Sequence, residues 1–218
     1  MNKLRKNVPR IKSVIVNYIL NNAKEFILIG LLFIIGVFVG VIMINNCNDL
    51  QRNEISTYIS EFINRLKNIE NIDKTSLIVD SIKNNIILAL IIWIAGTTVI
   101  GVPIVLAVIL FRGMCLGYTV SAISYTLGSL KGILFCIISL CMQNILFIPA
   151  ILSLGVSSIK LYKSIIKDKR KDNIKVEFVR HTIFSGLMLV ILILSSFVEN
   201  IVSVNLLKKM IKFFWKIY

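Results

Sequence analysis

The stretch from Gly101 to Pro149 is almost wholly apolar, yet strongly polar side chains lie inside its hydrophobic runs. Arg112 lies in one hydrophobic run, and Gln143 and Asn144 lie in the middle of the next. Such residues are costly at the centre of a bilayer, so they normally face protein or water and have a partner there. The sequence therefore predicts a membrane protein with one polar cluster, made of Arg112, Gln143 and Asn144, inside its helical bundle.

The composition agrees with a membrane protein. Hydrophobic residues make up 56% of the chain and charged residues 17%, and the mean hydropathy of +0.83 lies far outside the soluble range. The net charge of +14 comes from lysines and arginines beside the apolar runs, where they set membrane orientation, so it does not indicate nucleic-acid binding. We expect an all-α, polytopic helical bundle in contact with the lipid bilayer.

Five apolar runs are long enough to cross the membrane. About 20 helical residues span a hydrocarbon core of about 30 Å. We expect one integral membrane domain over residues 1–218, with transmembrane helices at 26–44, 84–101, 103–128, 133–159 and 181–200.

The second and third spans are not separated by a polar loop, and two break points compete. Pro103 suits the first turn of a helix, and a break just before it puts Arg112 in mid-bilayer. A break at Arg112 and Gly113 would place the arginine at the membrane surface but leave only about 15 residues for the next span, short of the usual length. We expect the break before Pro103.

The distribution of lysine and arginine predicts the topology. Segments 1–25 and 160–180 are strongly basic and therefore cytoplasmic, whereas 45–85 carries five basic and six acidic residues, a balance typical of the outer side. The tail 205–218 has lysines on one helical face and should lie along the interface. Five spans put this basic tail outside, against the usual tendency.

Apolar residues recur at a seven-residue spacing within segment 45–85 and predict an amphipathic extracytoplasmic helix. They form a stripe of Ile55, Ile59, Phe62, Leu66 and Ile69. An exposed stripe of this kind needs a cover. The bilayer surface or a neighbouring helix could supply it, and so could a docked partner protein.

Small residues at a four-residue spacing predict where helices pack closely. Two glycine pairs have this spacing, Gly36 with Gly40 and Gly113 with Gly117. Pro149 should kink the fourth span because its ring removes a backbone hydrogen bond.

We find no sequence pattern of catalysis or of cofactor or metal binding. Zinc-protease, Walker A, nucleophile-elbow and dinucleotide-loop motifs are missing, and the cysteines have no metal-ligand spacing. A lone His181 should lie at the membrane edge, and we assign it no chemistry. We expect a protein that is not an enzyme and has no cofactor.

The order of several motifs resembles the stage II sporulation protein M family. These motifs are Gly-Val-Pro103, Phe111-Arg112-Gly113, Gly117-Tyr118, Lys131-Gly132 and Gln143-Asn144-Ile-Leu-Phe-Ile-Pro149. In layout the resemblance covers the whole chain. Two positions depart from the family pattern: Met142 stands where proline is common, and no proline follows Glu199.

The resemblance implies a non-enzymatic part in endospore formation. It implies a multi-pass anchor in the mother-cell membrane that recruits peptidoglycan-remodelling partners, the stage II sporulation proteins D and P, to the septum during engulfment. The cluster at Arg112, Gln143 and Asn144 leaves a small transporter or channel as the alternative, since intramembrane polar residues also mark solute paths. The oligomeric state stays open, a homo-oligomer included.

Overall fold

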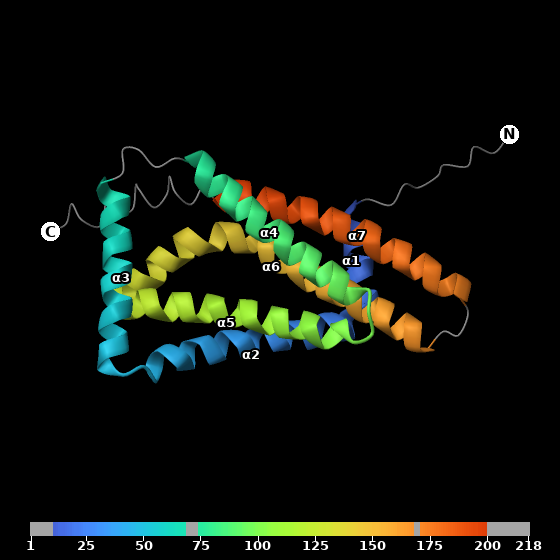
Figure 1. Cartoon of the computed structure of the whole chain (residues 1–218), viewed down its shortest axis with the longest axis horizontal. Helices are drawn as coiled ribbons and strands as arrows, with labels where there is room; N and C mark the ends of the chain where they lie inside the picture. Colours follow the sequence, from blue (N-terminus) through green and yellow to red (C-terminus); the bar gives the residue numbers. More distant parts are fainter. Residues whose placement is uncertain (1–10, 69–73, 168–170, 200–218) are drawn as a thin grey trace.

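The chain folds as a bundle of long α-helices (Figure 1). The structure, a computed structural model, describes residues 11–68, 74–167 and 171–199, and these contain seven helices and no strand. The helices are α1 (Ile11–Asn21), α2 (Ala23–Asn45), α3 (Asp49–Asn68), α4 (Lys74–Gly96), α5 (Gly101–Leu127), α6 (Ser129–Lys167) and α7 (Lys171–Val198). The predicted all-α fold is confirmed.

Five of these helices, α2 and α4 to α7, are long and apolar enough to cross a membrane. Their candidate spans are Ala23–Asn45, Ile78–Gly96, Gly101–Leu127, Asn144–Ile166 and Ile174–Val198. They run roughly along one axis, with many large apolar side chains on the outside of the bundle. The chain is therefore a multi-pass membrane protein. The predicted tail helix at 205–218 lies outside the described residues.

The break between the second and third spans falls just before Pro103. Helix α4 ends at Gly96 and α5 begins at Gly101, whose backbone N–H donates to the Thr98 hydroxyl at 3.0 Å. Pro103 thus occupies the first turn of α5, where the N–H that proline lacks would have no helical acceptor. As a result, Arg112 lies near the middle of α5 and not at a helix end.

Helix α6 is at the centre of the bundle. Over its apolar span 56% of the residues are buried, against 22 to 28% in the other four. Ile151 and Leu154 of α6 are fully buried in the main core, together with Ile29 of α2 and Ile109 of α5. Pro149 lies inside α6, which is curved in Figure 1. This central helix positions the polar residues described below.

Most of segment 160–180, the predicted cytoplasmic connection between the fourth and fifth spans, is helical. Helix α6 continues to Lys167 and α7 begins at Lys171, and both extend past the turn between α4 and α5 (Figure 1). Lys163 of α6 forms a salt bridge with Glu25 at the start of α2. The described basic side chains of this segment, those of Lys160, Lys163, Lys175 and Arg180, therefore lie on the ends of two helices.

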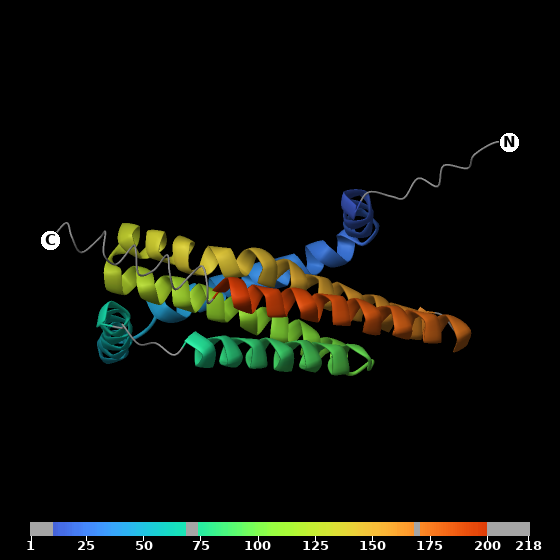
Figure 2. The ribbon, with the colours of Figure 1, turned by 90° about the horizontal axis from the view of Figure 1, so that it is seen from above.

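The basic N-terminal segment contains a helix that sequence analysis missed. Helix α1 lies crosswise to the spans, near the start of α2 (Figure 2). The ring of Tyr18 stacks on Phe184 of α7 at a centroid distance of 5.1 Å, and the ammonium of Lys160 lies 5.4 Å above it. Burial, with the nearby Glu177 carboxylate, raises the pKa of Tyr18 to about 12. The phenol therefore remains neutral against the core.

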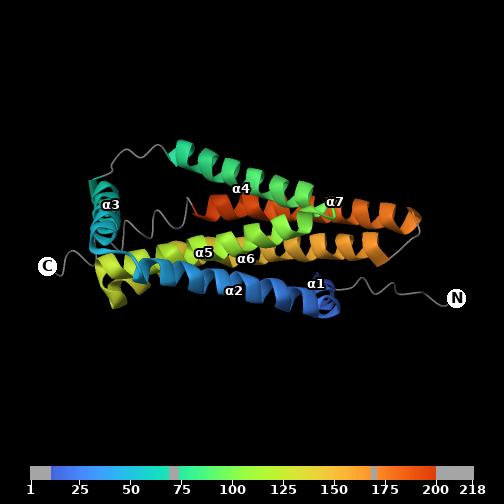
Figure 3. The same ribbon diagram turned by 60° about the horizontal axis from the view of Figure 1, so that its bottom comes forward.

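Helix α3 lies crosswise at the opposite end of the bundle, over the ends of α5 and α6 (Figure 3). Ile63 of α3 is 2% exposed and packs with Phe135 of α6, and Ile59, Ile123 and Leu127 surround them. This small second core fixes α3 on the turn between α5 and α6.

Candidate functional site

Helices α2 and α5 touch backbone to backbone through their glycines. A Cβ atom added to Gly36 would lie 2.2 Å from the Leu110 carbonyl oxygen, and one added to Gly117 would lie 2.0 Å from that of Val37. Gly40 and Gly113 are equally crowded by the opposite helix. The two predicted glycine pairs therefore lie in one interface between α2 and α5, which run side by side (Figure 3). These close contacts fix the position of α5 along α2.

A polar cavity of about 160 Å³ lies beside this interface. Arg112 of α5 and Asn144 of α6 both line it, because they are equally far along their helices from the turn at Gly128. Residues of α2, α4, α5 and α6 contribute to its wall: Phe33, Asn85, Arg112, Thr119, Asn144 and Phe147. The structure thus brings together two of the three predicted polar residues. The side chain of Gln143 lies outside the described residues.

Arg112 and Asn144 share this cavity without a direct bond. The guanidinium of Arg112 lies 5.5 Å from the centroid of the Phe147 ring, a cation–π arrangement. Among the described side chains, Arg112 makes no hydrogen bond with Asn144. Arg112 therefore meets the fourth span through the Phe147 ring and the shared cavity, and a bond to Gln143 stays a prediction.

Asn85 is a polar residue at this site that the sequence analysis did not single out. It is 4% exposed, and its amide N–H groups donate to the Leu192 carbonyl at 3.1 Å and the Ser196 hydroxyl at 2.7 Å. We had taken Gln143 and Asn144 as the polar groups within reach of Arg112, and Asn85 corrects this view. The signal was present as Asn84-Asn85 at the start of an apolar run, but sequence alone does not say which of the two faces inward.

His181, which we expected at the membrane edge, is buried within the bundle. Its exposed fraction is 2%, and its Nδ1 atom lies 2.9 Å from the Ser157 hydroxyl of α6. A Cβ atom added to Gly96 of α4 would lie 3.1 Å from His181 Nε2 and 2.3 Å from the Ser158 hydroxyl. This buried contact joins α4, α6 and α7.

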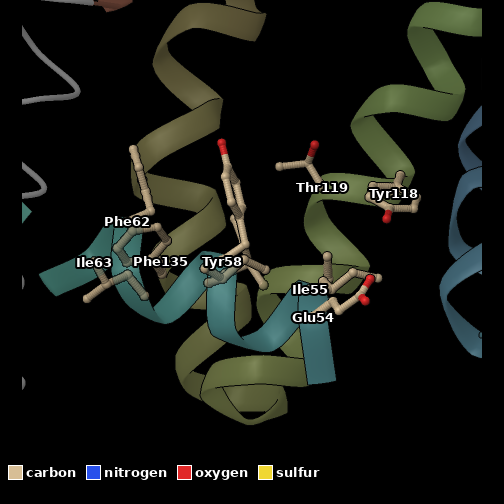
Figure 4. Close-up of a pocket in the computed structure, with 11 residues that line it drawn as sticks. Glu54, Ile55, Tyr58, Phe62, Ile63, Tyr118, Thr119 and Phe135 are labelled. Atoms are coloured by element: carbon tan, nitrogen blue, oxygen red, sulfur yellow. The ribbon is translucent and has the colours of Figure 1, made fainter. Parts of the chain in front are cut away.

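An open apolar groove of about 590 Å³ lies between α3 and the adjoining parts of α5 and α6 (Figure 4). Residues of all three helices line it, among them Ile55, Tyr58, Phe62, Tyr118, Ile123 and Phe135. Tyr58 points from α3 into the space between α5 and α6. Its side chain is 75% exposed and that of Phe62 is 48% exposed, so the groove presents aromatic surface.

The apolar face of α3 differs from the predicted stripe. Ile55 and Ile59 of the predicted stripe are partly buried. Ile63, which is not in the stripe, is more buried than either, and Phe62 lines the groove. Ile63 is the next residue after Phe62 along the chain, and it packs against Phe135 of α6. Ile69 and the side chain of Leu66 lie outside the described residues.

Comparison with family models gives a match to Stage II sporulation protein M over residues 29–204. The chain belongs to this family. The match runs from α2 through α7, so it contains the glycine interface, the polar cavity and the groove. Neither curated proteins nor solved structures give a match.

Membership in the stage II sporulation protein M family confirms the resemblance and makes the chain a multi-pass membrane protein of a sporulation family. Two of the motifs that suggested the family meet at the cavity, because Phe111-Arg112-Gly113 supplies its arginine and the Gln143–Pro149 motif supplies Asn144 and Phe147. Glu199, after which the family proline is missing, accepts a hydrogen bond from Ser81 at 2.6 Å. This bond joins the end of α7 to α4.

Replacing Asn85 with leucine should destabilise the bundle, whereas Asn84→Leu should not. Asn85 is buried and donates hydrogen bonds to Leu192 and Ser196 of α7. The loss of such hydrogen bonds costs about 1–2 kcal/mol in membrane helices. Asn84 is the matched control because it has the same side chain and is exposed. Thermal unfolding of the purified variants in detergent would measure the difference. Equal unfolding temperatures would contradict the described contact between α4 and α7.

Proposed function

We propose that this chain is a non-enzymatic scaffold of endospore formation. It holds peptidoglycan-remodelling partners, the stage II sporulation proteins D and P, at the outer face of the septal mother-cell membrane during engulfment. Membership in a sporulation family supports the process, and the multi-pass fold supports a role as a membrane anchor. The partners and the septal location belong to the proposal.

The observation that carries the scaffold role is the aromatic groove on α3. Helix α3 is an amphipathic helix outside the five spans, and Ile63 anchors it to the bundle while Tyr58 and Phe62 remain exposed. A groove of about 590 Å³ has the size of a typical ligand pocket and can receive side chains of a bound protein. Aromatic residues at such places supply most of the binding energy in many interfaces.

The double variant Tyr58→Ser, Phe62→Ser should separate binding from folding. Both side chains are exposed, so the protein should still insert and accumulate. Each aromatic anchor typically contributes roughly 2 kcal/mol to binding, so co-purification of the two partners from sporulating cells should fall more than about tenfold. Fluorescent fusions of the partners should also fail to gather at the septum.

Leu50→Ser is the matched control on the same helix. Leu50 is 76% exposed but does not line the groove, so its loss should leave the partners bound. If the Tyr58 and Phe62 variant retained its partners and supported engulfment, docking in this groove would be wrong.

A further inference from the structure

We propose that the polar cavity at Arg112 binds one carboxylate group. This inference does not rest on the scaffold role, since the cavity lies within the spans and the groove lies at α3. It concerns a binding site for a chemical class of ligand that fits the cavity in charge and size.

The first argument is charge. Arg112 lies near the middle of a membrane-spanning helix, where an uncompensated guanidinium is costly. It is the one charged residue among the described side chains that line the cavity. The ring of Phe147 offsets part of the cost but carries no negative charge. The described lining residues therefore make the site electropositive and supply no counter-ion.

The second argument is hydrogen bonding. Arginine has five N–H donors in a planar fork that fits a carboxylate with two parallel bonds. The amide N–H groups of Asn85 are used by α7, and the Thr119 hydroxyl donates to the Cys115 carbonyl at 2.8 Å. Within the part of the chain that the structure describes, the guanidinium fork and the Asn144 amide remain as donors at the cavity wall. These groups suit an acceptor that brings two oxygens.

The third argument is size. A volume of about 160 Å³ has room for a small polar group and bound water. Four helices contribute to its wall, so a whole helix does not fit, whereas a single carboxylate with one or two waters does. The group can belong to a small free acid or to a glutamate side chain that reaches in from another membrane helix. The chemistry at Arg112 is the same for both.

The first arm of the test uses the full chain purified in detergent, with sodium acetate replacing sodium chloride at constant ionic strength. Binding should raise the unfolding temperature saturably, by about 3 °C at an acetate concentration well above the dissociation constant. The ¹⁹F signal of trifluoroacetate should broaden in the presence of the protein and recover when acetate is added. This second readout requires no variant.

The second arm uses a fluorescent apolar peptide of about 20 residues with one central glutamate, in lipid vesicles that contain the chain. Energy transfer from the chain to this peptide should exceed that to a peptide with glutamine at the same place. A response in the second arm assigns the site to a protein side chain, and a response in the first arm alone assigns it to a free acid.

Arg112→Gln should abolish either response, because it keeps hydrogen-bonding groups and removes the charge. Arg180→Gln is the control, since Arg180 is exposed and paired with Glu177. If Arg112→Gln does not accumulate, Arg112→Lys replaces it and should weaken binding, since lysine lacks the planar fork. A response that persists without Arg112, or no response in either arm, would overturn the proposal.

Discussion

The variant Gly117→Ala should lose a large part of its folded protein from the membrane. The added methyl group would lie 2.0 Å from the Val37 carbonyl oxygen, and backbone atoms of α2 cannot move aside without shifting the helix. Overpacking of this kind costs roughly 1–3 kcal/mol, a large fraction of the total stability of most domains. A Cβ atom added to Gly40 would lie 2.1 Å from the Met114 carbonyl oxygen, so Gly40→Ala should add to the loss. Steady-state protein levels and thermal unfolding in detergent would measure both.

Gly30→Ala makes the same chemical change in α2 at a place where the new methyl group meets nothing within 4 Å. Alanine favours a helix over glycine by about 0.5–1 kcal/mol, so this control should be neutral or slightly stabilising. The sign of the effect should therefore differ between Gly30 and Gly117. If both substitutions had the same effect, the close contact between α2 and α5 would be wrong.

A second large effect is expected from Gly96→Ala at the buried junction of α4, α6 and α7. The new Cβ atom would lie 2.3 Å from the Ser158 hydroxyl and 2.9 Å from its Cβ. Both of these atoms belong to one small side chain, so Ser158→Gly should remove the clash. The double variant should be more stable than the sum of the single effects predicts, by about 1–2 kcal/mol, which is a typical coupling between residues in contact.

Ser157→Gly is the control for this rescue. Ser157 is the neighbouring serine, but its hydroxyl faces His181 Nδ1 at 2.9 Å and not Gly96. It should therefore destabilise the protein without restoring Gly96→Ala. Urea or thermal unfolding of the four proteins in each cycle would give the coupling. Equal rescue by the two serine substitutions would show that the effect is general loosening of α6 and not relief of one contact.

Much of the architecture was predictable because it depends on local properties of the chain. The length and apolarity of each run predict a span, since every backbone polar group in a bilayer has to be bonded within a helix. The short break ahead of Pro103 follows from proline's fit to a helix start. The spacing of Gly36 with Gly40, and of Gly113 with Gly117, marks faces where backbones can meet.

Other features were decided only when distant segments came together. Asn84 and Asn85 are chemically identical, and the position of α7 makes the second of them the buried one. His181 is buried because Gly96 and Ser157 approach it from two other helices. Arg112 faces Phe147 and a cavity because α5 and α6 turn back at Gly128 with equal spacing. Periodicity gives the faces of one helix, whereas the partner of each face depends on how several helices pack, and no local pattern records that choice.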